Sequence, residues 1–540
     1  MIFSIDQNCH SLWDAVPKCQ ALAAAGLPLR HFVEDTDIAF TALGSHGQGG
    51  QLRLARERFH HSGGADWGAA MFYYQFLGRL PVDVRRWEGL TGMKTAALAR
   101  GLDRTVEDLY EEFSPADNWQ LVGPSYVGDR HHHRLIADIT VAEAGGFLRE
   151  LMHKARADML ERFPAKAARD RTAEWFAAEE RRVEQLLAEH TGGKLVELYR
   201  TWMGQLLGGK AELAMASSLS ALSANSAGVA LLEMFCQHYE QASALYNESL
   251  RQSDASPGPL ETAEGELPFF AALDYQGHLV RTNMYLRDGS VRIADDSFAL
   301  DSGRVDVAKL KAAGVWGLAG KAVVLAIQVR WGDRGAELAL PYRGSAYVPA
   351  AQHLAGQLSR QGLLVGEVRP LLRVRFHMLD RMRQLDTVIR LPEHLAKEFG
   401  TDEVPARRLA EGCGELARQA GERLEQFKSV SGRRQWQRDN YPTLLGEVER
   451  LDARRRELAA REPKSPAIRQ VWKQLKVLQA DLLAQTLGRI ALDWQMRDIE
   501  YWDSRGAIWP WCIALGGEKF YNHVIAKAEI YREPPPLGDE

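Results

Sequence analysis

The chain has 540 residues, and its 67 Lys and Arg residues against 71 Asp and Glu residues leave a formal net charge of −4. Hydrophobic residues make up 46% of the chain and charged residues 26%, close to the average for soluble globular proteins. This composition excludes an intrinsically disordered chain and a strongly basic nucleic-acid coat protein. At roughly 100–200 residues per domain, the length predicts two to four domains.

The sequence carries no signal for a membrane or for secretion. No stretch approaches the roughly 18–20 uninterrupted apolar residues of a membrane helix, and the N-terminus lacks the basic and apolar regions of a signal peptide. The scattered cysteines form no CxxC pair, which argues against a disulfide framework or a cysteine-based zinc site. We therefore expect a cytoplasmic protein without membrane or nucleic-acid partners. The five cysteines are Cys9, Cys19, Cys236, Cys413 and Cys512.

The start of the chain predicts a strand, a helix and a second strand, at 2–5, 12–22 and 27–33. The second strand ends in the acidic cluster Glu34-Asp35-Thr36-Asp37. Open α/β sheets bind ligands at the carboxyl ends of their strands, where carboxylates can hold a substrate ammonium, a ribose hydroxyl or a magnesium ion. A solvated helix N-cap explains Asp and Thr at these positions equally well, so both interpretations stay open.

The loop after the first strand holds Gln7, Asn8, Cys9 and His10. In α/β folds this loop opens onto the ligand crevice, where the two amides could bind a substrate or a phosphate. Cys9 could be a nucleophile, but no known Cys-His motif surrounds it, and a structural polar turn is the stronger interpretation. Gln7, Asn8 and His10 are therefore candidate site residues.

Residues 45–195 predict a mainly helical region with two candidate features. The loop 123–128, which contains Tyr126, precedes a predicted helix near Asp129, so its N–H groups could bind an anion, although it lacks the GK[ST] ending of a P-loop. Adjacent residues on a helix point about 100° apart, so the run His131-His132-His133 cannot ligate one ion. Substrate contact by His132 or a plain surface cluster is favoured over a metal site.

From residue 195 onward, helical and strand-like segments alternate, which predicts a parallel sheet. The predicted helices lie at 195–207, 226–250 and 347–361. The predicted strands lie at 211–217, 269–273, 279–285, 290–293, 322–329, 338–341 and 372–376.

The turn 342–347, between a predicted strand and a helix, again falls where a ligand crevice would lie. It makes Arg343, Ser345 and Tyr347 candidates for substrate or nucleotide binding, and a plain surface turn is the alternative. Several arginines fall in or beside strands and need a carboxylate or phosphate partner, which Glu34, Asp35 or Asp37 could supply in part. These arginines are Arg330, Arg369, Arg373 and Arg375.

The chain from residue 401 onward predicts long helical tracts at 404–428 and 443–500, the second broken near Pro463 and Pro466. A 3-4-3-4 apolar spacing within the second tract predicts a coiled-coil seam, and hence a homodimer. The seam consists of Ile468, Val471, Leu475, Leu478 and Leu482.

Several segments together resemble one known family. The strand 27–33 ends in an acidic run similar to E-D-H-D, and Tyr347 matches the tyrosine of a G-P-G-E-x-x-Y turn. Arg373 lies where the family has a P-R-L motif, and Asp380-Arg381 lies where it has an E-R pair. These motifs resemble those of the BshC family, the cysteine ligases assigned to bacillithiol biosynthesis. The resemblance extends over 1–40 and 195–540.

The resemblance implies an α/β fold with a class-I-synthetase-like Rossmann core, a large helical insertion and a C-terminal coiled-coil domain that dimerises. The core would comprise 1–44 and 195–400, the insertion 45–194 and the helical domain 401–540. It also implies a ligase that joins an amino acid, by resemblance cysteine, to an amine-bearing small molecule, with nucleotide activation and with ATP or ADP and magnesium as the expected cofactors.

The same resemblance suggests roles for the candidates. Glu34, Asp35 and Asp37 would hold the substrate ammonium or a metal, Gln7 and His10 would line the nucleotide or acyl side, and Arg373 and Tyr347 would fix an anionic group.

Two alternatives stay open. One is a non-catalytic dimeric assembly protein on a degenerate ligase fold. The other places a small-molecule site within the helical insertion, lined by Trp67, Tyr73, Tyr74, Trp119 and His132.

Overall fold

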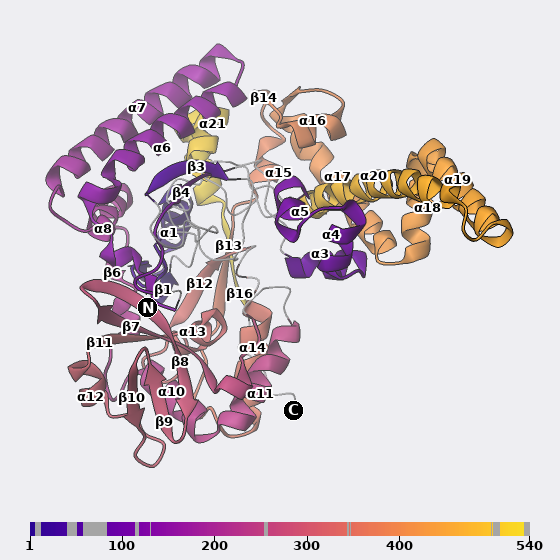
Figure 1. The fold of residues 1–540 in the computed structure, drawn as a ribbon. Helices are drawn as coiled ribbons and strands as arrows, with labels where there is room; N and C mark the ends of the chain where they lie inside the picture. The colour runs from indigo at the N-terminus through magenta and orange to yellow at the C-terminus, as the bar shows by residue number, and fades with distance from the viewer. Residues whose placement is uncertain are drawn as a thin grey trace.

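The chain folds as a mixed α/β structure around two six-stranded sheets (Figure 1). This computed structural model describes residues 1–5, 12–39, 51–57, 84–113, 118–129, 131–252, 258–342, 345, 347–497, 499 and 508–533. The mixed α/β class expected from the sequence is thereby confirmed.

The first sheet, called the parallel sheet below, has its first strand near the centre. The chain adds two strands on one side of β1 and three on the other, so the strand order reverses between β1 and β12. All neighbours pair in parallel except β13 and β16, which are antiparallel. The spatial order is β16 (Glu529–Glu533), β13 (Leu371–Arg375), β12 (Glu337–Pro341), β1 (Ile2–Ile5), β2 (Leu29–Val33) and β6 (Glu212–Met215).

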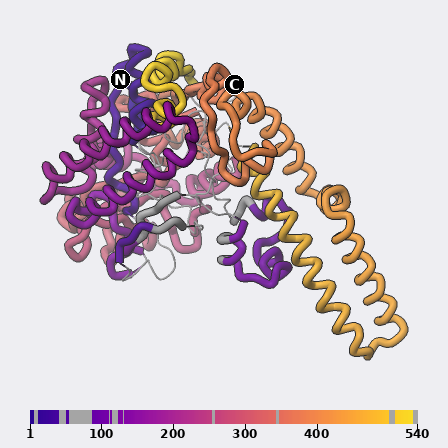
Figure 2. The backbone as a smooth tube through the Cα atoms, turned by 90° about the horizontal axis from the view of Figure 1, so that it is seen from above, coloured from indigo at the N-terminus to yellow at the C-terminus, as the bar shows by residue number. Residues whose placement is uncertain are grey.

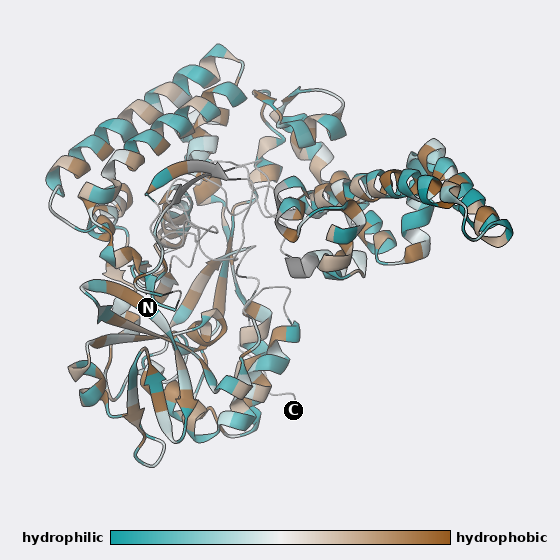
Figure 3. Ribbon diagram, in the orientation of Figure 1, coloured by the Kyte–Doolittle hydropathy of each residue, from teal (hydrophilic) through white to brown (hydrophobic). Residues whose placement is uncertain are grey.

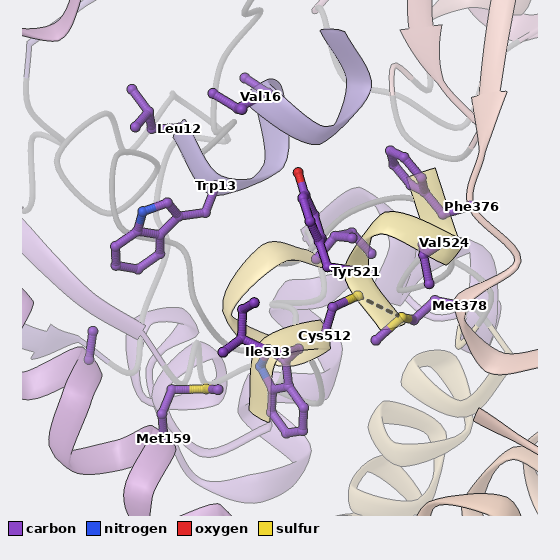
Figure 4. Packing of buried hydrophobic residues seen from close by; sticks show 14 of the residues in the cluster. Leu12, Trp13, Val16, Met159, Phe376, Met378, Cys512, Ile513, Tyr521 and Val524 are labelled. Carbon is purple, nitrogen blue, oxygen red and sulfur yellow. Dashed lines mark hydrogen bonds between the residues drawn. The ribbon is translucent and has the colours of Figure 1, made fainter. Parts of the chain in front are cut away.

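Helices cover both faces of the parallel sheet, because its strands are apolar on both sides. One face packs against α1 (Leu12–Ala24), α8 (Leu195–Leu207) and α21 (Ile508–Ala526). Figure 4 shows part of this cluster, with Trp13 on α1 and Cys512, Ile513 and Tyr521 on α21. The opposite face packs against α13 (Ala322–Gln328) and the start of α14 (Val348–Arg360).

The second sheet, called the antiparallel sheet below, buries one face against α10 (Ala227–Gln237), α11 (Tyr239–Ser249), α13 and α14. Since α13 and α14 contribute to the cores of both sheets, they hold the two sheets together. The strands are β10 (Asp296–Ala299), β9 (Ser290–Ile293), β8 (His278–Arg287), β7 (Glu266–Tyr275) and β11 (Val315–Gly320), in that order, with β5 (His133–Arg134) also paired to β8.

The remaining short elements connect these layers. They are β3 (Arg53–Glu57), β4 (Asn118–Val122), α9 (Ser217–Ser220), α12 (Val307–Ala312), α15 (Met378–Met382), β14 (Val388–Arg390), α16 (Glu393–Phe399) and β15 (Glu403–Pro405).

Two helical groups complete the molecule. The antiparallel pair α6 (Val141–Arg162) and α7 (Lys166–Glu189) shares the core of the parallel sheet. The pair α19 (Pro442–Arg461) and α20 (Pro466–Arg497) projects away from the body (Figures 1 and 2). The base of that projection packs against several other helices. They are α3 (Val84–Thr91), α4 (Thr95–Leu102), α5 (Val106–Phe113), α17 (Ala406–Phe427) and α18 (Val430–Asn440).

The structure differs from the sequence-based expectations at α13 and at 226–250. Residues 322–329 were expected to form a strand, but they form the helix α13. A short apolar run buried on all sides has no helical period, so pattern alone cannot separate it from a buried strand. The single helix expected at 226–250 is two helices that meet at His238 (φ −123°, ψ 39°).

The domain boundaries also differ from the expected ones. Strand β16 joins the parallel sheet, so residues 401–540 do not form a separate helical unit. The helices α3 and α4 pack against α17 and α20 rather than against α6 and α7. Within the projection, Val471, Leu475 and Leu482 of the expected coiled-coil seam pack on α19 of the same chain.

Polar residues cover the outer sides of the long helices, whereas the strands inside the body are largely hydrophobic (Figure 3). Among the described residues, none of the helices combines the length and apolarity needed to cross a membrane.

A buried carboxylate anchors the projecting helices, and we expect its removal to destabilise the fold. Asp493 on α20 is fully buried and accepts hydrogen bonds from Arg423 on α17 (2.8–3.1 Å) and from Arg489 (2.6 and 2.9 Å). Asp493→Asn should lower the unfolding free energy by about 1.5–3 kcal/mol, because it removes the one carboxylate that bonds to Arg423 among the described residues, whereas Arg489 keeps its ion pair with Glu398. Urea unfolding followed by circular dichroism measures this effect. Asp481→Asn, at an exposed position of the same helix, is the control and should change stability by less than about 0.5 kcal/mol; equal midpoints for both variants would contradict the assignment.

Candidate functional site

The acidic cluster that follows β2 is buried at the carboxyl edge of the parallel sheet. Glu34, Asp35 and Asp37 are only 8%, 5% and 3% exposed. Residues 34–39 form no helix. The alternative of a solvated helix N-cap is therefore wrong, and the position is the one where open α/β sheets bind ligands.

Each carboxylate is held by a different set of donors. Glu34 Oε1 accepts from the N–H and the hydroxyl of Thr36, at 2.6 and 2.7 Å. Asp35 accepts from the N–H and the hydroxyl of Ser217, which follows β6, at 2.7 and 2.5 Å. Asp37 Oδ1 accepts from the N–H of Ile38 at 2.8 Å. These bonds fix the direction of all three side chains.

Burial changes the protonation of this cluster. Burial raises the pKa of Glu34 to about 8, and the negative charges of Asp37 and Asp35 add to the effect. Burial also raises the pKa of Asp35, although the hydrogen bonds from Ser217 oppose the shift. A carboxyl group whose pKa lies near neutral pH is suited to proton transfer.

The antiparallel sheet contributes the positive side of the site. Arg281 on β8 donates from Nη1 to Asp37 Oδ1 at 2.8 Å, so this ion pair joins the two sheets. The guanidinium of Arg281 also lies over the ring of Phe270 on β7, with Cζ 4.1 Å from the centroid. The ammonium of Lys321, 5.5 Å from the same centroid, forms an ion pair with Glu266. The result is a patch of two cations around one aromatic ring.

His133 lies beside Arg281, because the two residues are cross-strand partners of β5 and β8. Burial, with a smaller contribution from the positive charge of Arg281, lowers the pKa of His133 to about 4. The imidazole is therefore neutral at physiological pH and can donate one hydrogen bond and accept another.

Several buried polar atoms around this spot have no hydrogen-bond partner among the described residues. In the ion pair they are Asp37 Oδ2 and Arg281 Nε, and beside it is His133 Nδ1. Buried polar atoms are nearly always paired in folded proteins. A ligand that carries both donors and acceptors would satisfy this set.

In the run His131-His132-His133, the candidate from the sequence was His132, but the structure places His133 at the site. The ring of His132 stacks against Tyr275, with centroids 4.1 Å apart, whereas the ring of Tyr126 lies 4.8 Å from that of His133. The expectation of a helix near Asp129 was also wrong, since the chain turns there and enters β5. Neighbouring residues of an extended strand point to opposite faces, which explains why one histidine reaches the site and the next does not.

The arginine-rich candidates lie elsewhere on the parallel sheet. Arg373 on β13 pairs with Glu533 of β16 and not with the acidic cluster, and β12 and β1 separate β13 from β2. Ser345 (φ +51°) and Tyr347 lie between β12 and α14. The structure therefore separates two groups of candidates that the sequence interpretation had joined.

Some candidates cannot be placed. Gln7, Asn8, His10 and Arg343 lie outside the described residues, as do Cys9, Trp67, Tyr73 and Tyr74. In the part of the chain that the structure describes, no group of three or more His, Cys, Asp or Glu residues is arranged to hold a metal ion.

Sequence reasoning missed four residues that the structure places at or near the site. Arg281, Ser217 and Phe270 contact the acidic cluster or its partner, but nothing local marks them, because each comes from a distant segment. Lys18 on α1 is 2% exposed and donates to the carbonyl of Ile5, at the carboxyl end of β1, over 3.4 Å. The available signal in the sequence was a lysine among the apolar residues of the predicted helix 12–22, because lysine is rarely buried without a role.

Comparisons of the chain with protein-family models, curated proteins and solved structures gave no match. The site is therefore interpreted from its geometry alone.

The raised pKa of Glu34 has a consequence for stability. Between pH values of about 4.5 and 8, the folded state binds more protons at Glu34 than the unfolded state does, so stability falls as the pH rises through this window. Glu34→Gln keeps the acceptor for Thr36 but cannot ionise. We expect this variant to lose less stability than the parent protein between about pH 5 and pH 8, which thermal unfolding across that range would measure. Glu264→Gln, at an exposed glutamate, is the control, and identical pH profiles for the parent and Glu34→Gln would contradict the shift.

Proposed function

We propose that the protein is a ligase-like enzyme that binds an amino acid between the acidic cluster and Arg281. The observation that carries this proposal is the buried pair of Asp37 and Arg281, in which Asp37 Oδ2 and Arg281 Nε have no partner among the described residues. An amino acid presents an ammonium and a carboxylate, one for each side of such a pair. A polyanion would meet three carboxylates here, so it fits less well.

The strand order supports a Rossmann-like core. Counted along the chain, the sheet reads third, second, first, fourth, fifth and sixth strand, which is the order of doubly wound dinucleotide-binding folds. Such folds bind ligands at the carboxyl ends of the strands where the order reverses, here between β1 and β12. We place the activating nucleotide, ATP with magnesium, on the loops that follow these strands. The roles of Gln7, Asn8, His10 and Arg343 in binding it stay predictions.

The proposed reaction activates the carboxylate of one substrate and transfers the acyl group to an amine. Attack of the carboxylate on ATP would expel ADP from the γ-phosphorus or pyrophosphate from the α-phosphorus. The amine would then attack the activated carboxyl carbon, form the amide and release inorganic phosphate or AMP, respectively. The attacking amine must lose a proton. Glu34, with a pKa near 8, is the group in the site best matched to accept it. Cysteine as the amino acid remains an expectation from the family resemblance, and we place the protein in the cytoplasm.

We expect amino acids to stabilise the protein through Asp37 and Arg281. A thermal-shift screen with cysteine, other amino acids, ATP and ADP tests this, because a ligand at about 100 times its dissociation constant stabilises the fold by about 2.7 kcal/mol. Asp37→Asn and Arg281→Gln should each abolish the shift caused by the amino acid. Arg292→Gln, at an exposed position on β9, should keep it. A full shift with both site variants would rule out this binding mode, and Asp35→Asn tests the same cluster independently.

A second candidate function, a dimeric assembly protein, is favoured by the surface of the projecting helices. Trp472 and Val477 on α20 are 41% and 68% exposed, although the ammonium of Lys476 lies 4.8 Å from the Trp472 ring centroid. The seam residues expected to dimerise pack within the chain, so a second copy would have to bind through these exposed side chains. Exposed large apolar residues on a projecting element are typical of a contact surface.

We expect Trp472→Lys combined with Val477→Lys to convert a dimer into a monomer, because two apolar contacts are replaced by like charges. Light scattering after size exclusion measures the mass. Val430→Lys, at another exposed valine near the base of the projection, is the control. A parent protein that is already monomeric would exclude the assembly function proposed here.

A further inference from the structure

A second group of charges lies on the other side of the parallel sheet, under α13 and α14. Arg330, which follows α13, is fully buried. Its Nε donates to the carbonyl of Ala326 at 2.7 Å. Its Nη1 donates to Gln352 Oε1 at 3.2 Å and to the carbonyl of Arg369 at 3.1 Å. All three acceptors are neutral, so no carboxylate bonds to this guanidinium among the described residues.

The remaining nitrogen of this side chain is unused. Arg330 Nη2 is buried and has no hydrogen-bond partner among the described residues. A fully buried guanidinium without an anionic partner is costly, because charge in a protein interior is normally paired. Burial lowers the pKa of Arg330 to about 10, and the positive charge of Arg373 acts in the same direction. The arginine nevertheless stays charged at physiological pH.

Arg373 supplies a second guanidinium nearby. Its side chain lies on the same face of the sheet as Leu371, which packs in the cluster beneath α13 and α14. Its Nε donates to Glu533 Oε1 at 2.8 Å, and its Nη1 donates to the carbonyl of Pro341 at 3.2 Å. Glu533, whose side chain is 31% exposed, acts electrostatically on Arg330 as well. Glu533 is the register partner of Leu371, two residues along the chain from Arg369, whose carbonyl accepts from Arg330. The carboxylate bonded to Arg373 therefore lies on the side of the sheet that holds Arg330.

The start of α14 adds to the positive character. Tyr347, the N-cap residue of this 13-residue helix, makes no capping hydrogen bond from its side chain, and Gln352, one turn into the helix, holds Arg330. The N-terminal end of a helix favours anions through its N–H groups and dipole. The helix end and both arginines thus lie on one side of the sheet.

We propose that Arg330, Arg373 and the start of α14 form a binding site for a phosphoryl group of a small molecule, and that Glu533 occupies it when no ligand is bound. A tetrahedral oxyanion with several oxygens can accept from both guanidinium groups at once, as a single carboxylate oxygen cannot. The exposed side of Glu533 is the route by which the anion reaches Arg373. This site lies at the end of β12, where the proposed function places the nucleotide, so it rests on that part of the proposed function and not on the amino-acid site at β2.

Calorimetric titration of the full chain with inorganic phosphate tests the site. Glu533→Gln removes the competing carboxylate without emptying the core, so we expect it to bind phosphate on the order of tenfold more tightly than the parent protein. Glu529→Gln is the matched control, since it lies on the same strand but pairs with His377, and we expect its affinity to stay within about twofold of the parent.

Two further measurements test the role of Arg330 and the identity of the anion. Arg330→Met should weaken phosphate binding at least tenfold, and if it does not fold, the comparison of Glu533→Gln with Glu529→Gln decides alone. Unchanged or weaker binding by Glu533→Gln, or an equal gain in Glu529→Gln, overturns the proposal. Tighter binding of acetate than of phosphate by Glu533→Gln overturns the phosphoryl assignment.

Discussion

The ion pair between Asp37 and Arg281 joins the carboxyl edge of the parallel sheet to the antiparallel sheet, and the candidate site depends on it. The Asp37 side chain is 4% exposed and that of Arg281 20%, so neither charge is well solvated. Buried charges persist when they are paired and hydrogen-bonded, and here each partner keeps one atom without a bond among the described residues. The arrangement therefore holds the two sheets together and still leaves hydrogen-bonding capacity for a ligand.

The charged and buried surroundings of this pair also affect the protonation of neighbouring groups. The carboxylates come from one loop after β2, whereas the cations Arg281 and Lys321 come from the antiparallel sheet and the segment after it. Burial raises the pKa of Glu34, and the neighbouring negative charges of Asp37 and Asp35 add to the rise. Burial also lowers the pKa of His133, and the positive charge of Arg281 adds to the fall. Burial thus gives both shifts their direction, and one partner of the ion pair adds to each of them.

The local parts of this arrangement could be predicted from the sequence, and the long-range parts could not. The strand that ends at Val33 and the acidic cluster after it are visible as a pattern of adjacent residues. The partner Arg281 is 244 residues away in the chain. The sequence interpretation instead offered the acidic cluster as part of the partners of Arg330, Arg369, Arg373 and Arg375. The helix α13 was mistaken for a strand because burial on all sides removes the period that pattern recognition needs. Similarly, β16 could not be assigned to the parallel sheet, since a strand's neighbour is decided by tertiary packing.

The edge strand β16 shows how a segment distant in sequence supplies partners for charged residues on and after β13. Its two glutamates, Glu529 and Glu533, lie on one face of the strand and pair with His377 and Arg373. His377 adopts a left-handed backbone conformation (φ +54°) directly after β13, which a residue other than glycine holds only when its surroundings compensate for the strain. The bond from His377 to Glu529, at 2.8 Å, supplies part of that compensation. Since β13 lies between β12 and β16, the pairing of β16 brings Glu533 to Arg373 and so positions this guanidinium, whose side chain is 7% exposed. Its positive charge acts on Arg330 on the same side of the sheet.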